Sequence, residues 1–181
     1  MDKKTVILGV SGSIAAYKAA DIVNRLNNSN VDVHVMMTQA AQAFITPLTL
    51  QTLSKNPVHF NVLEEKIATE IAHIDITKKA DLLIIAPATA NIIGKLANGI
   101  ADDMLSTSVL ALDTKVKKII APAMNQNMFG NPVVQKNLQQ LKALGWLEID
   151  PRTSLLACGD VGKGALADVD VIVQTVLENL Q

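Results

Sequence analysis

Apolar and polar positions along the chain follow two alternating patterns. Short runs of Val, Ile, Leu and Met are followed by longer segments in which apolar residues recur every three or four positions, as in an amphipathic helix. Such alternation predicts a mostly parallel sheet covered on both faces, in a single-domain Rossmann-like (flavodoxin-like) three-layer α/β fold over residues 1–181. The predicted strands cover residues 5–10, 31–37, 82–86, 118–121 and 147–149.

Ordinary start signals mark several of the predicted helices. Ser13 is a plausible N-cap for a helix that begins at Ile14, and Pro47 suits a first helical turn. Residues 58–62 indicate a weak strand or a loop, residues 69–79 have a less clear pattern, and a loop is predicted from residue 150 through 164. The predicted helices cover residues 14–26, 39–44, 47–53, 90–98, 103–112, 132–144 and 169–180.

One strand-and-turn phrase occurs twice in the chain. Residues 84–91 are Ile-Ile-Ala-Pro-Ala-Thr-Ala-Asn, and residues 119–125 are Ile-Ile-Ala-Pro-Ala-Met-Asn. Proline has no N–H for a strand ladder, so each copy predicts a strand that stops at its proline. If these strands are neighbours, Asn91 and Asn125 lie at the carboxyl edge of the sheet, where such folds bind ligands. The plainer interpretation is that buried parallel strands resemble one another.

A turn of glycine and serine follows the first strand and favours an anion. Residues 9–13 are Gly-Val-Ser-Gly-Ser and lead into a helix, whose free N–H groups and dipole attract negative charge. The glycine spacing fits neither a Walker loop nor a dinucleotide fingerprint. Thr38 ends the second strand, where a dinucleotide site usually has an acidic residue, although a Thr there is more often a helix cap. A mononucleotide therefore fits this edge better than a dinucleotide.

Composition and charge narrow the class of protein. Of the 181 residues, 49% are hydrophobic and 18% are charged, which excludes a disordered chain and predicts a substantial core. The net charge of -1 argues against nucleic acid or an anionic membrane as a partner, and no apolar run is long enough to span a bilayer. The single cysteine and the absence of a signal-like N-terminus predict a cytoplasmic protein.

One histidine and the cysteine are candidates for chemistry. His73 lies in Ala-His-Ile-Asp, and Cys158 lies in the glycine-rich stretch Leu-Leu-Ala-Cys-Gly-Asp-Val-Gly-Lys-Gly. A lone histidine is more often structural than catalytic, and buried cysteines are commonly inert. A cysteine in a glycine-rich loop is a stronger candidate for a chemical role than a buried one. His34 and His59 are interpreted as structural, and no metal site is expected.

Five motifs along the chain form a specific set. They are Gly-Ser-Ile-Ala-Ala-Tyr-Lys at 12–18, Pro-Ala-Thr-Ala-Asn at 87–91, Asn-Gly-Ile-Ala-Asp-Asp at 98–103, Pro-Ala-Met-Asn-Gln-Asn-Met at 122–128 and Ala-Cys-Gly-Asp at 157–160. Together they resemble the phosphopantothenoylcysteine decarboxylase family over nearly the whole chain. The resemblance implies an FMN enzyme that converts 4'-phosphopantothenoylcysteine to 4'-phosphopantetheine and CO2 on the route to coenzyme A.

The resemblance also implies roles for individual residues. His73, Asn125 and Cys158 are the expected catalytic residues. Further substrate contacts are expected from Met128, Ala157 and Lys163, although Ser154 and Ala165 depart from the Gly and Arg that the family commonly has near them. The residues expected to bind FMN are Gly9, Ser11, Gly12, Ser13, Ile14, Thr38, Ala88, Thr89, Asn91, Ser106 and Ala123.

The implied reaction removes CO2 only after an oxidation. A carboxylate beside an amide nitrogen keeps its CO2 because the carbanion left behind has no electron sink. Oxidation of the substrate thiol to a thioaldehyde, with FMN accepting the hydride, supplies that sink. His73 is expected to assist thiol deprotonation and Asn125 to hold the carboxylate. Reduced flavin then returns the hydride while Cys158 donates a proton.

Three other functions are compatible with such a fold. A peptidyl-cysteine decarboxylase would stop at the oxidised enethiol and would not need Cys158. A non-catalytic regulatory subunit would usually have lost the histidine or gained an acidic tail, and neither change is present. A flavin prenyltransferase would have a different glycine-rich opening and no reason to keep the cysteine loop.

The resemblance also implies partners. Members of the family assemble as trimers or multiples of trimers with the active site shared between subunits, so a homo-oligomer is expected. An alanine-rich helix at 92–97 or 104–112 is a candidate for the contact between subunits. Longer relatives carry a second, synthetase domain, for which 181 residues leave no room, so a separate synthetase protein is expected to supply the substrate.

Overall fold

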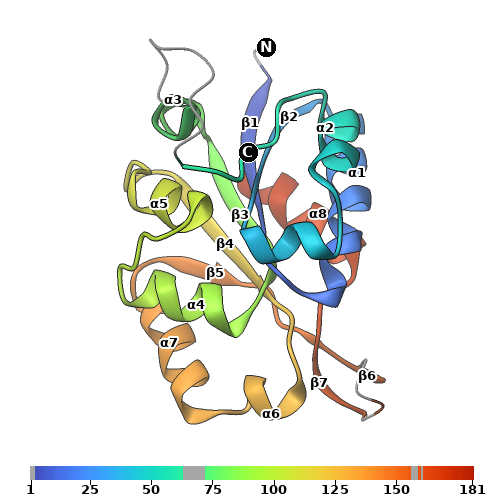
Figure 1. Ribbon diagram of the computed structural model, residues 1–181, viewed down its shortest axis with the longest axis vertical. Helices are drawn as coiled ribbons and strands as arrows, with labels where there is room; N and C mark the ends of the chain where they lie inside the picture. Colours follow the sequence, from blue (N-terminus) through green and yellow to red (C-terminus); the bar gives the residue numbers. More distant parts are fainter. Residues whose placement is uncertain (1–2, 63–71, 156–158, 160) are drawn as a thin grey trace.

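A five-stranded parallel sheet in the order β2-β1-β3-β4-β5 forms the centre of the computed structural model (Figure 1). The structure describes residues 3–62, 72–155, 159 and 161–181. The strand order is that of flavodoxin-like folds, whose crossovers change direction between β1 and β3, and it confirms the predicted class. The strands are β1 (Lys4–Val10), β2 (Val31–Met37), β3 (Leu82–Ala88), β4 (Lys117–Pro122) and β5 (Trp146–Glu148).

Helices cover both faces of the sheet, which gives the three predicted layers (Figure 1). One face is covered by α1 (Ala19–Asn28), α2 (Pro47–Ser54) and α8 (Val169–Asn179). The other face is covered by α3 (Ala72–Lys79), α4 (Ala90–Ala97), α5 (Met104–Leu110) and α7 (Pro132–Ala143). None of the described helices is long and apolar enough to cross a membrane.

The central strand β3 explains why the chain needs two helical layers. All seven of its residues are buried, and their side chains alternate between the faces of the sheet. Leu82 and Ile84 belong to the core under α1 and α8, whereas Leu83 and Ile85 belong to the core under α4, α5 and α7. A continuous apolar run is the pattern expected of a strand that is covered on both sides.

Short elements at the carboxyl edge differ from the predictions. The predicted helix at 14–26 is a 3-10 turn, η1 (Ile14–Lys18), followed by α1, and η2 (Gln39–Ala43) is also a 3-10 turn. A short helix, α6 (Gln126–Phe129), was not predicted. The predicted loop before residue 164 contains an antiparallel hairpin of β6 (Arg152–Leu155) and β7 (Val161–Ala165). Glycine at every second position of β7 left no apolar periodicity to recognise.

The two prolines of the repeated phrase behave differently. β4 ends at Pro122 as predicted, but β3 continues past Pro87 to Ala88 with a shift of register against β4. The prediction that β3 stops at its proline is therefore wrong. Pro87 falls within the register shift, and its carbonyl accepts hydrogen bonds from the backbone N–H and the hydroxyl of Ser11 at 3.3 and 2.7 Å.

Candidate active site

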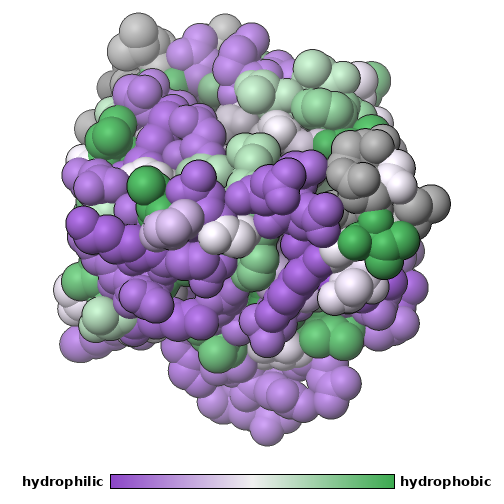
Figure 2. Space-filling view, turned by 90° about the horizontal axis from the view of Figure 1, so that it is seen from below, coloured by the Kyte–Doolittle hydropathy of each residue, from purple (hydrophilic) through white to green (hydrophobic). Residues whose placement is uncertain are grey.

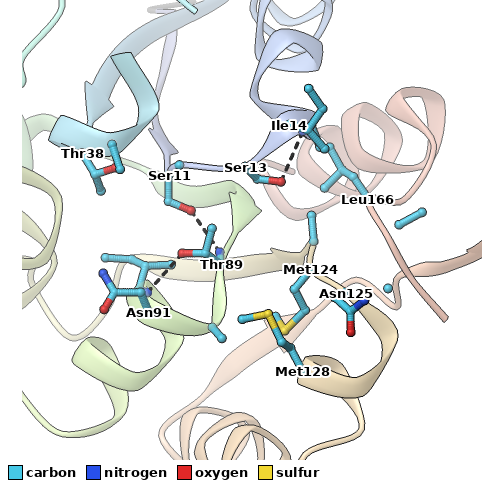
Figure 3. Close-up of a pocket in the computed structure, with 18 of the residues that line it drawn as sticks. Ser11, Ser13, Ile14, Thr38, Thr89, Asn91, Met124, Asn125, Met128 and Leu166 are labelled. Carbon is cyan, nitrogen blue, oxygen red and sulfur yellow. Dashed lines mark hydrogen bonds between the residues drawn. The ribbon is translucent and has the colours of Figure 1, made fainter. Parts of the chain in front are cut away.

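A cavity of about 1010 Å³ opens at the carboxyl edge of the sheet (Figure 3). Its walls come from the segments after β1, β2, β3 and β4 and from the β6–β7 hairpin. Viewed from below, the surface of the molecule is largely hydrophilic with separate hydrophobic side chains (Figure 2). The predicted site residues that line the cavity are Ser11, Gly12, Ser13, Ile14, Thr38, Thr89, Asn91, Ala123, Asn125 and Met128.

Three hydroxyl side chains in the cavity wall each begin a helical turn. Ser13 accepts a hydrogen bond from the N–H of Ala15, and Thr38 accepts one from the N–H of Ala41. Thr89 caps α4 in the same way. An accepting cap leaves the hydroxyl hydrogen available for donation. These side chains can therefore cap their helices and donate to an anion in the cavity together.

Ser11 and Gly12 bring the first of these turns against its neighbours. The Ser11 hydroxyl donates to Pro87 O and accepts from the N–H of Thr89 at 3.0 Å, which ties the turn after β1 to the end of β3. A Cβ on Gly12 would lie 2.5 Å from the Cβ of Ala40, so only glycine fits between the turn and η2. Ser11 thus serves as a buried tie between segments.

Asn125 stands where the loop after β4 meets the hairpin. Its Oδ1 accepts from the N–H of Asn127 at 2.8 Å and caps α6. The preceding residue, Met124, donates its N–H to Gly164 O on β7 at 2.9 Å. A Cβ on Gly164 would lie 2.2 Å from Met124 O, and one on Gly162 would clash with Gln126. The two glycines of β7 therefore let the hairpin lie directly on the Asn125 loop.

Lys95, Asp102 and Asp103 form a charged cluster in the cavity wall. Lys95 Nζ lies 2.6 Å from Asp102 Oδ1 and 2.7 Å from Asp103 Oδ2. Burial opposes both charges, but the hydrogen bonds outweigh it, so the pKa of Lys95 is raised. The pKa of Asp103 is lowered for the same reason, with the backbone N–H of Ser106 adding a further hydrogen bond. These charges satisfy one another and hold α4 against α5.

Lys18 and Arg152 form a second charged group in the wall. Arg152 Nη1 lies 2.9 Å from Asp168, and its Nε donates to Leu166 O at 3.1 Å. Burial lowers the pKa of Lys18, and the nearby positive charge of Arg152 lowers it further, while Asp168 raises it. Within the described part of the chain, Lys18 Nζ has neither a hydrogen bond nor an ion pair.

Comparison with known proteins shows the family to which the chain belongs. The Flavoprotein family model matches residues 1–181. This chain belongs to that family. The chain is 52% identical over 177 residues to a probable phosphopantothenoylcysteine decarboxylase of Streptococcus mutans, covering 98% of this chain and 99% of the relative. It is 47% identical to the coenzyme A biosynthesis bifunctional protein CoaBC of Bacillus subtilis, covering 96% of this chain but 42% of that protein.

Solved structures of flavoproteins agree with the fold. A PPC decarboxylase mutant complexed with pantothenoylaminoethenethiol superimposes with a TM-score of 0.88 at 33% identity, covering 97% of both chains. The FMN binding protein AtHal3 gives a TM-score of 0.85 at 33% identity, covering 97% of this chain and 96% of that one. The predicted resemblance to the decarboxylase family is therefore confirmed.

Several predicted site residues of this flavoprotein do not line the cavity. Gly9 lies within β1, where a Cβ would lie 2.6 Å from the Leu105 side chain. Ala88 is buried, and its carbonyl accepts from the N–H of Ala123. The Ser106 hydroxyl accepts the N–H of Asp103 in the capping box of α5. Lys163 lies 3.5 Å from Asp150 and over the Phe129 ring.

Three predicted residues fall partly or wholly outside the described structure. Ala157 and Cys158 are not among the described residues. His73 belongs to helix α3, but its side chain lies outside the described part. Among the side chains that the structure does describe, no group of three or more His, Cys, Asp or Glu could hold a metal ion.

Sequence reasoning missed the charged residues of the cavity. Lys18, Asp102 and Asp103 all lie within motifs that supported the family resemblance, but their side chains were given no role. Lys95 and Arg152 lie outside those motifs. The available signal was that Lys18 and Asp103 each follow a turn at the carboxyl edge. Spacing along the chain could not reveal which charges pair, because the pairing partners come from different elements.

Proposed function

We propose that this flavoprotein is an FMN-dependent phosphopantothenoylcysteine decarboxylase, a carboxy-lyase that acts in coenzyme A biosynthesis. The observation that carries the proposal is the cavity that joins the hydroxyl-lined turns to Asn125, in a chain 52% identical to a probable enzyme of that activity along nearly its whole length. Strand ends at a topological switch point are the usual ligand site of this fold.

The residues of the cavity fit FMN. A phosphate needs hydrogen-bond donors, and the hydroxyls of Ser13, Thr38 and Thr89 can each donate while capping a helical turn. The cavity of about 1010 Å³ matches the upper end of ordinary ligand sites, which leaves space for a cofactor with a substrate beside it. Asn91 and Ile14 would flank the cofactor, and bound FMN would supply a reversible hydride acceptor.

Asn125 is proposed to bind and orient the substrate carboxylate. A carboxylate needs hydrogen-bond donors, and the Asn125 side chain carries an NH2 donor group, whereas its Oδ1 accepts from the N–H of Asn127. That geometry positions the carboxylate for loss of CO2. Met128 lies beside Asn125 in the cavity wall and is half exposed, which suits contact with the apolar arm of the substrate (Figure 3).

His73 and Cys158 remain predicted proton carriers. His73 is proposed to assist deprotonation of the substrate thiol, since an imidazole exchanges protons near neutral pH. Cys158 is proposed to return a proton to the decarboxylated product. The sequence places Cys158 between β6 and β7, and β7 contacts the Asn125 loop. Ala157 and Lys163 belong to the same proposed substrate segment.

The main alternative is oxidative decarboxylation of a peptidyl cysteine. The FMN-dependent cysteine decarboxylase SpaF superimposes with a TM-score of 0.84 at 29% identity, so the fold alone does not separate the two activities. The two activities differ in their product: the alternative stops at an oxidised enethiol, whereas the proposed enzyme releases the saturated thiol.

The first experiment is to purify the protein, record its visible spectrum and identify any released cofactor by mass. A yellow protein with bound FMN that converts phosphopantothenoylcysteine to phosphopantetheine is the expected result. A colourless protein that does not take up added FMN would contradict the flavoenzyme proposal. Release of an enethiol from a peptide with a C-terminal cysteine, without turnover of phosphopantothenoylcysteine, would favour the alternative.

Three further proposals concern the setting of the enzyme. A homo-oligomer, a trimer or a multiple of trimers, is proposed to share the active site between subunits. A separate synthetase protein is proposed to provide phosphopantothenoylcysteine. Cytoplasmic localisation is proposed because a single cysteine suits a reducing compartment.

A further inference from the structure

One end of the cavity carries positive charge that the protein does not neutralise. Lys18 and Arg152 both line the cavity, and their charges act on each other. Asp168 pairs with Arg152 at 2.9 Å, and Lys18 has no acidic partner in hydrogen-bond contact within the described residues. Two cations and one carboxylate leave about one net positive charge at this end. Burying a cation without a partner costs free energy unless a bound anion compensates its charge.

The cationic end shares η1 with Ser13 but is separate from Thr38 and Thr89. Arg152 pairs with Ala165 across the hairpin and donates to Leu166 O. In Figure 3, Leu166 lies beside Ile14, whereas Thr38 lies at the opposite side of the view. Lys18 is the last residue of η1, which starts at Ile14. The cations therefore lie toward the hairpin, and the hydroxyls of Thr38 and Thr89 lie toward the other side.

The hairpin connects the cations to Asn125. Gly164 O accepts the N–H of Met124, and the next residue of β7, Ala165, is the strand partner of Arg152. Asn125, Gly164, Ala165 and Arg152 are thus linked through the hairpin in the cavity wall, and Lys18 lies near enough to Arg152 for their charges to interact. A ligand whose carboxylate reaches Asn125 can extend along this wall to the cationic end.

We infer that Lys18 and Arg152 form the subsite for the terminal phosphate monoester of the substrate, at the opposite end from the carboxylate held by Asn125. This inference rests on the proposed function, because it uses a substrate that carries a carboxylate at one end and a phosphate at the other. Lysine and arginine together suit a phosphate dianion, with the lysine acting as a point charge and the guanidinium as a planar donor. The hydroxyls of Thr38 and Thr89 then remain for the cofactor phosphate.

Calorimetric titration of the FMN-loaded protein with two non-reactive probes tests this subsite. The probes are 4'-phosphopantothenate and pantothenate, which lack the cysteine and differ only in the phosphate. Lys18→Gln and Arg152→Gln are each expected to weaken binding of phosphopantothenate by about tenfold or more, the usual effect of losing a charged hydrogen bond. Pantothenate binding and FMN content are expected to stay unchanged. Lys136→Gln, an exposed change on α7 away from the cavity, is the control and should alter neither probe.

The contrary results are distinct from one another. Equal weakening of the binding of both probes would overturn the inference, because the cations would then affect the shape of the cavity and not contact the phosphate. Loss of FMN affinity with phosphopantothenate binding intact would assign the cations to the cofactor phosphate instead. Arg152→Lys, which keeps the charge, should bind phosphopantothenate more tightly than Arg152→Gln does. If Arg152→Lys binds no better and Lys18→Gln binds phosphopantothenate as tightly as wild type, the inference is also overturned.

Turnover by the wild-type protein separates the two proposals. If the wild type decarboxylates phosphopantothenoylcysteine but the variants show no phosphate-selective loss, the proposed function stands and the subsite is wrong. If the variants lose phosphopantothenate binding selectively but the wild type decarboxylates nothing, the subsite stands and the proposed function is wrong.

Discussion

At the level of single residues, the cavity wall uses side chains for more than one purpose. Ser13, Thr38 and Thr89 stabilise helical turns and keep hydroxyl hydrogens for a ligand. Asn125 caps α6 through its oxygen, and its amide is also a hydrogen-bond donor. Such dual use means that an alanine substitution removes a cap, worth about 1 kcal/mol, as well as a ligand contact. Informative variants therefore keep the cap and change only the chemistry.

Asn125→Asp is such a variant. An aspartate oxygen can still accept from the N–H of Asn127, so stability should stay within about 0.5 kcal/mol of wild type. Its negative charge would face the substrate carboxylate, and the repulsion should lower kcat/KM by at least about tenfold. Urea unfolding and steady-state decarboxylation measure the two effects. A variant with normal turnover would remove Asn125 from the site.

Gly164→Ala tests the contact between hairpin and loop. The new Cβ would lie 2.2 Å from the Met124 carbonyl oxygen, a backbone atom that cannot move alone. We expect a cost of about 1–3 kcal/mol and a loss of turnover, because the Asn125 loop must shift. Gly94→Ala is the matched control: its Cβ would have only a 3.7 Å neighbour, and alanine should stabilise α4 by up to about 1 kcal/mol. Equal behaviour of the two variants in urea unfolding and turnover would contradict the packing argument.

At the level of elements, α5 is held by its first turn. Asp103 accepts the N–H of Ser106 at 2.8 Å, Ser106 accepts the N–H of Asp103, and Lys95 of α4 pairs with the same carboxylate. Ser106 was predicted to contact FMN, but its hydroxyl closes this capping box and is fully buried. The arrangement makes the start of α5 sensitive to the charge of Asp103.

Acid should weaken this element. The pKa of Asp103 is lowered from 3.8 in the folded protein, because its hydrogen bonds outweigh burial. A lowered folded pKa gives stability that is complete above the unfolded pKa and is lost as pH falls through the folded value. Asp103→Asn should therefore be less stable than wild type at neutral pH, and the difference should shrink below about pH 4. Urea unfolding across that range measures it; a difference that grows toward low pH would contradict the sign.

At the level of the whole molecule, two cores meet at one sheet and leave the carboxyl edge open. The helices at 92–97 and 104–112 are predicted candidates for the contact with a partner subunit. Their residues Ile92, Ile93 and Leu105 are buried in the second core, whereas Leu110 of α5 is 55% exposed. Large hydrophobic side chains are exposed elsewhere, and Tyr17 and Leu48 are 60% and 69% exposed. The contact between subunits therefore stays a prediction, and it can use the exposed faces of these helices or other exposed apolar positions.

Leu48→Asp tests one such surface. If subunits meet over Leu48, a buried charge should dissociate the oligomer into monomers, because an unpaired charge in an apolar contact is costly. Sedimentation velocity of wild type and variant measures the change. Lys136→Gln on the exposed side of α7 provides a control that should keep the wild-type mass. A wild-type protein that sediments as a monomer would contradict the proposed oligomer outright.

Cofactor binding should raise the stability of the whole fold. The cavity joins the segments after β1, β2, β3 and β4, so FMN would bind only the folded chain. With free FMN at about 100 times its Kd, the expected gain is about 2.7 kcal/mol, seen as a higher Tm than that of the apoprotein. Riboflavin, which lacks the phosphate, should give a smaller gain if the hydroxyl-lined turns bind phosphate. Equal shifts from the two would argue against a phosphate site.

Local sequence patterns predicted the layers, the position of the site and its caps. The alternation of apolar runs with helical spacing identified the five strands of the parallel sheet, and Ser13 and Thr38 follow strands as local rules require. These features depend on near neighbours along the chain, which are visible in the sequence. The paired Asn91 and Asn125 lie in one cavity because neighbouring parallel strands end at the same edge.

Features that depend on distant segments emerged only in three dimensions. The β6–β7 hairpin exists because Arg152 and Thr153 find partners near Ala165 and because glycines let β7 lie on the Asn125 loop. The position of Lys163 over the Phe129 ring and the meeting of Lys18 with Arg152 follow from that pairing. The two hairpin strands are close in the chain, but the alternating glycines of β7 leave no strand pattern to recognise. The contacts of the hairpin with the Asn125 loop and of Arg152 with Lys18 join segments far apart in the chain, so composition and spacing do not reveal them.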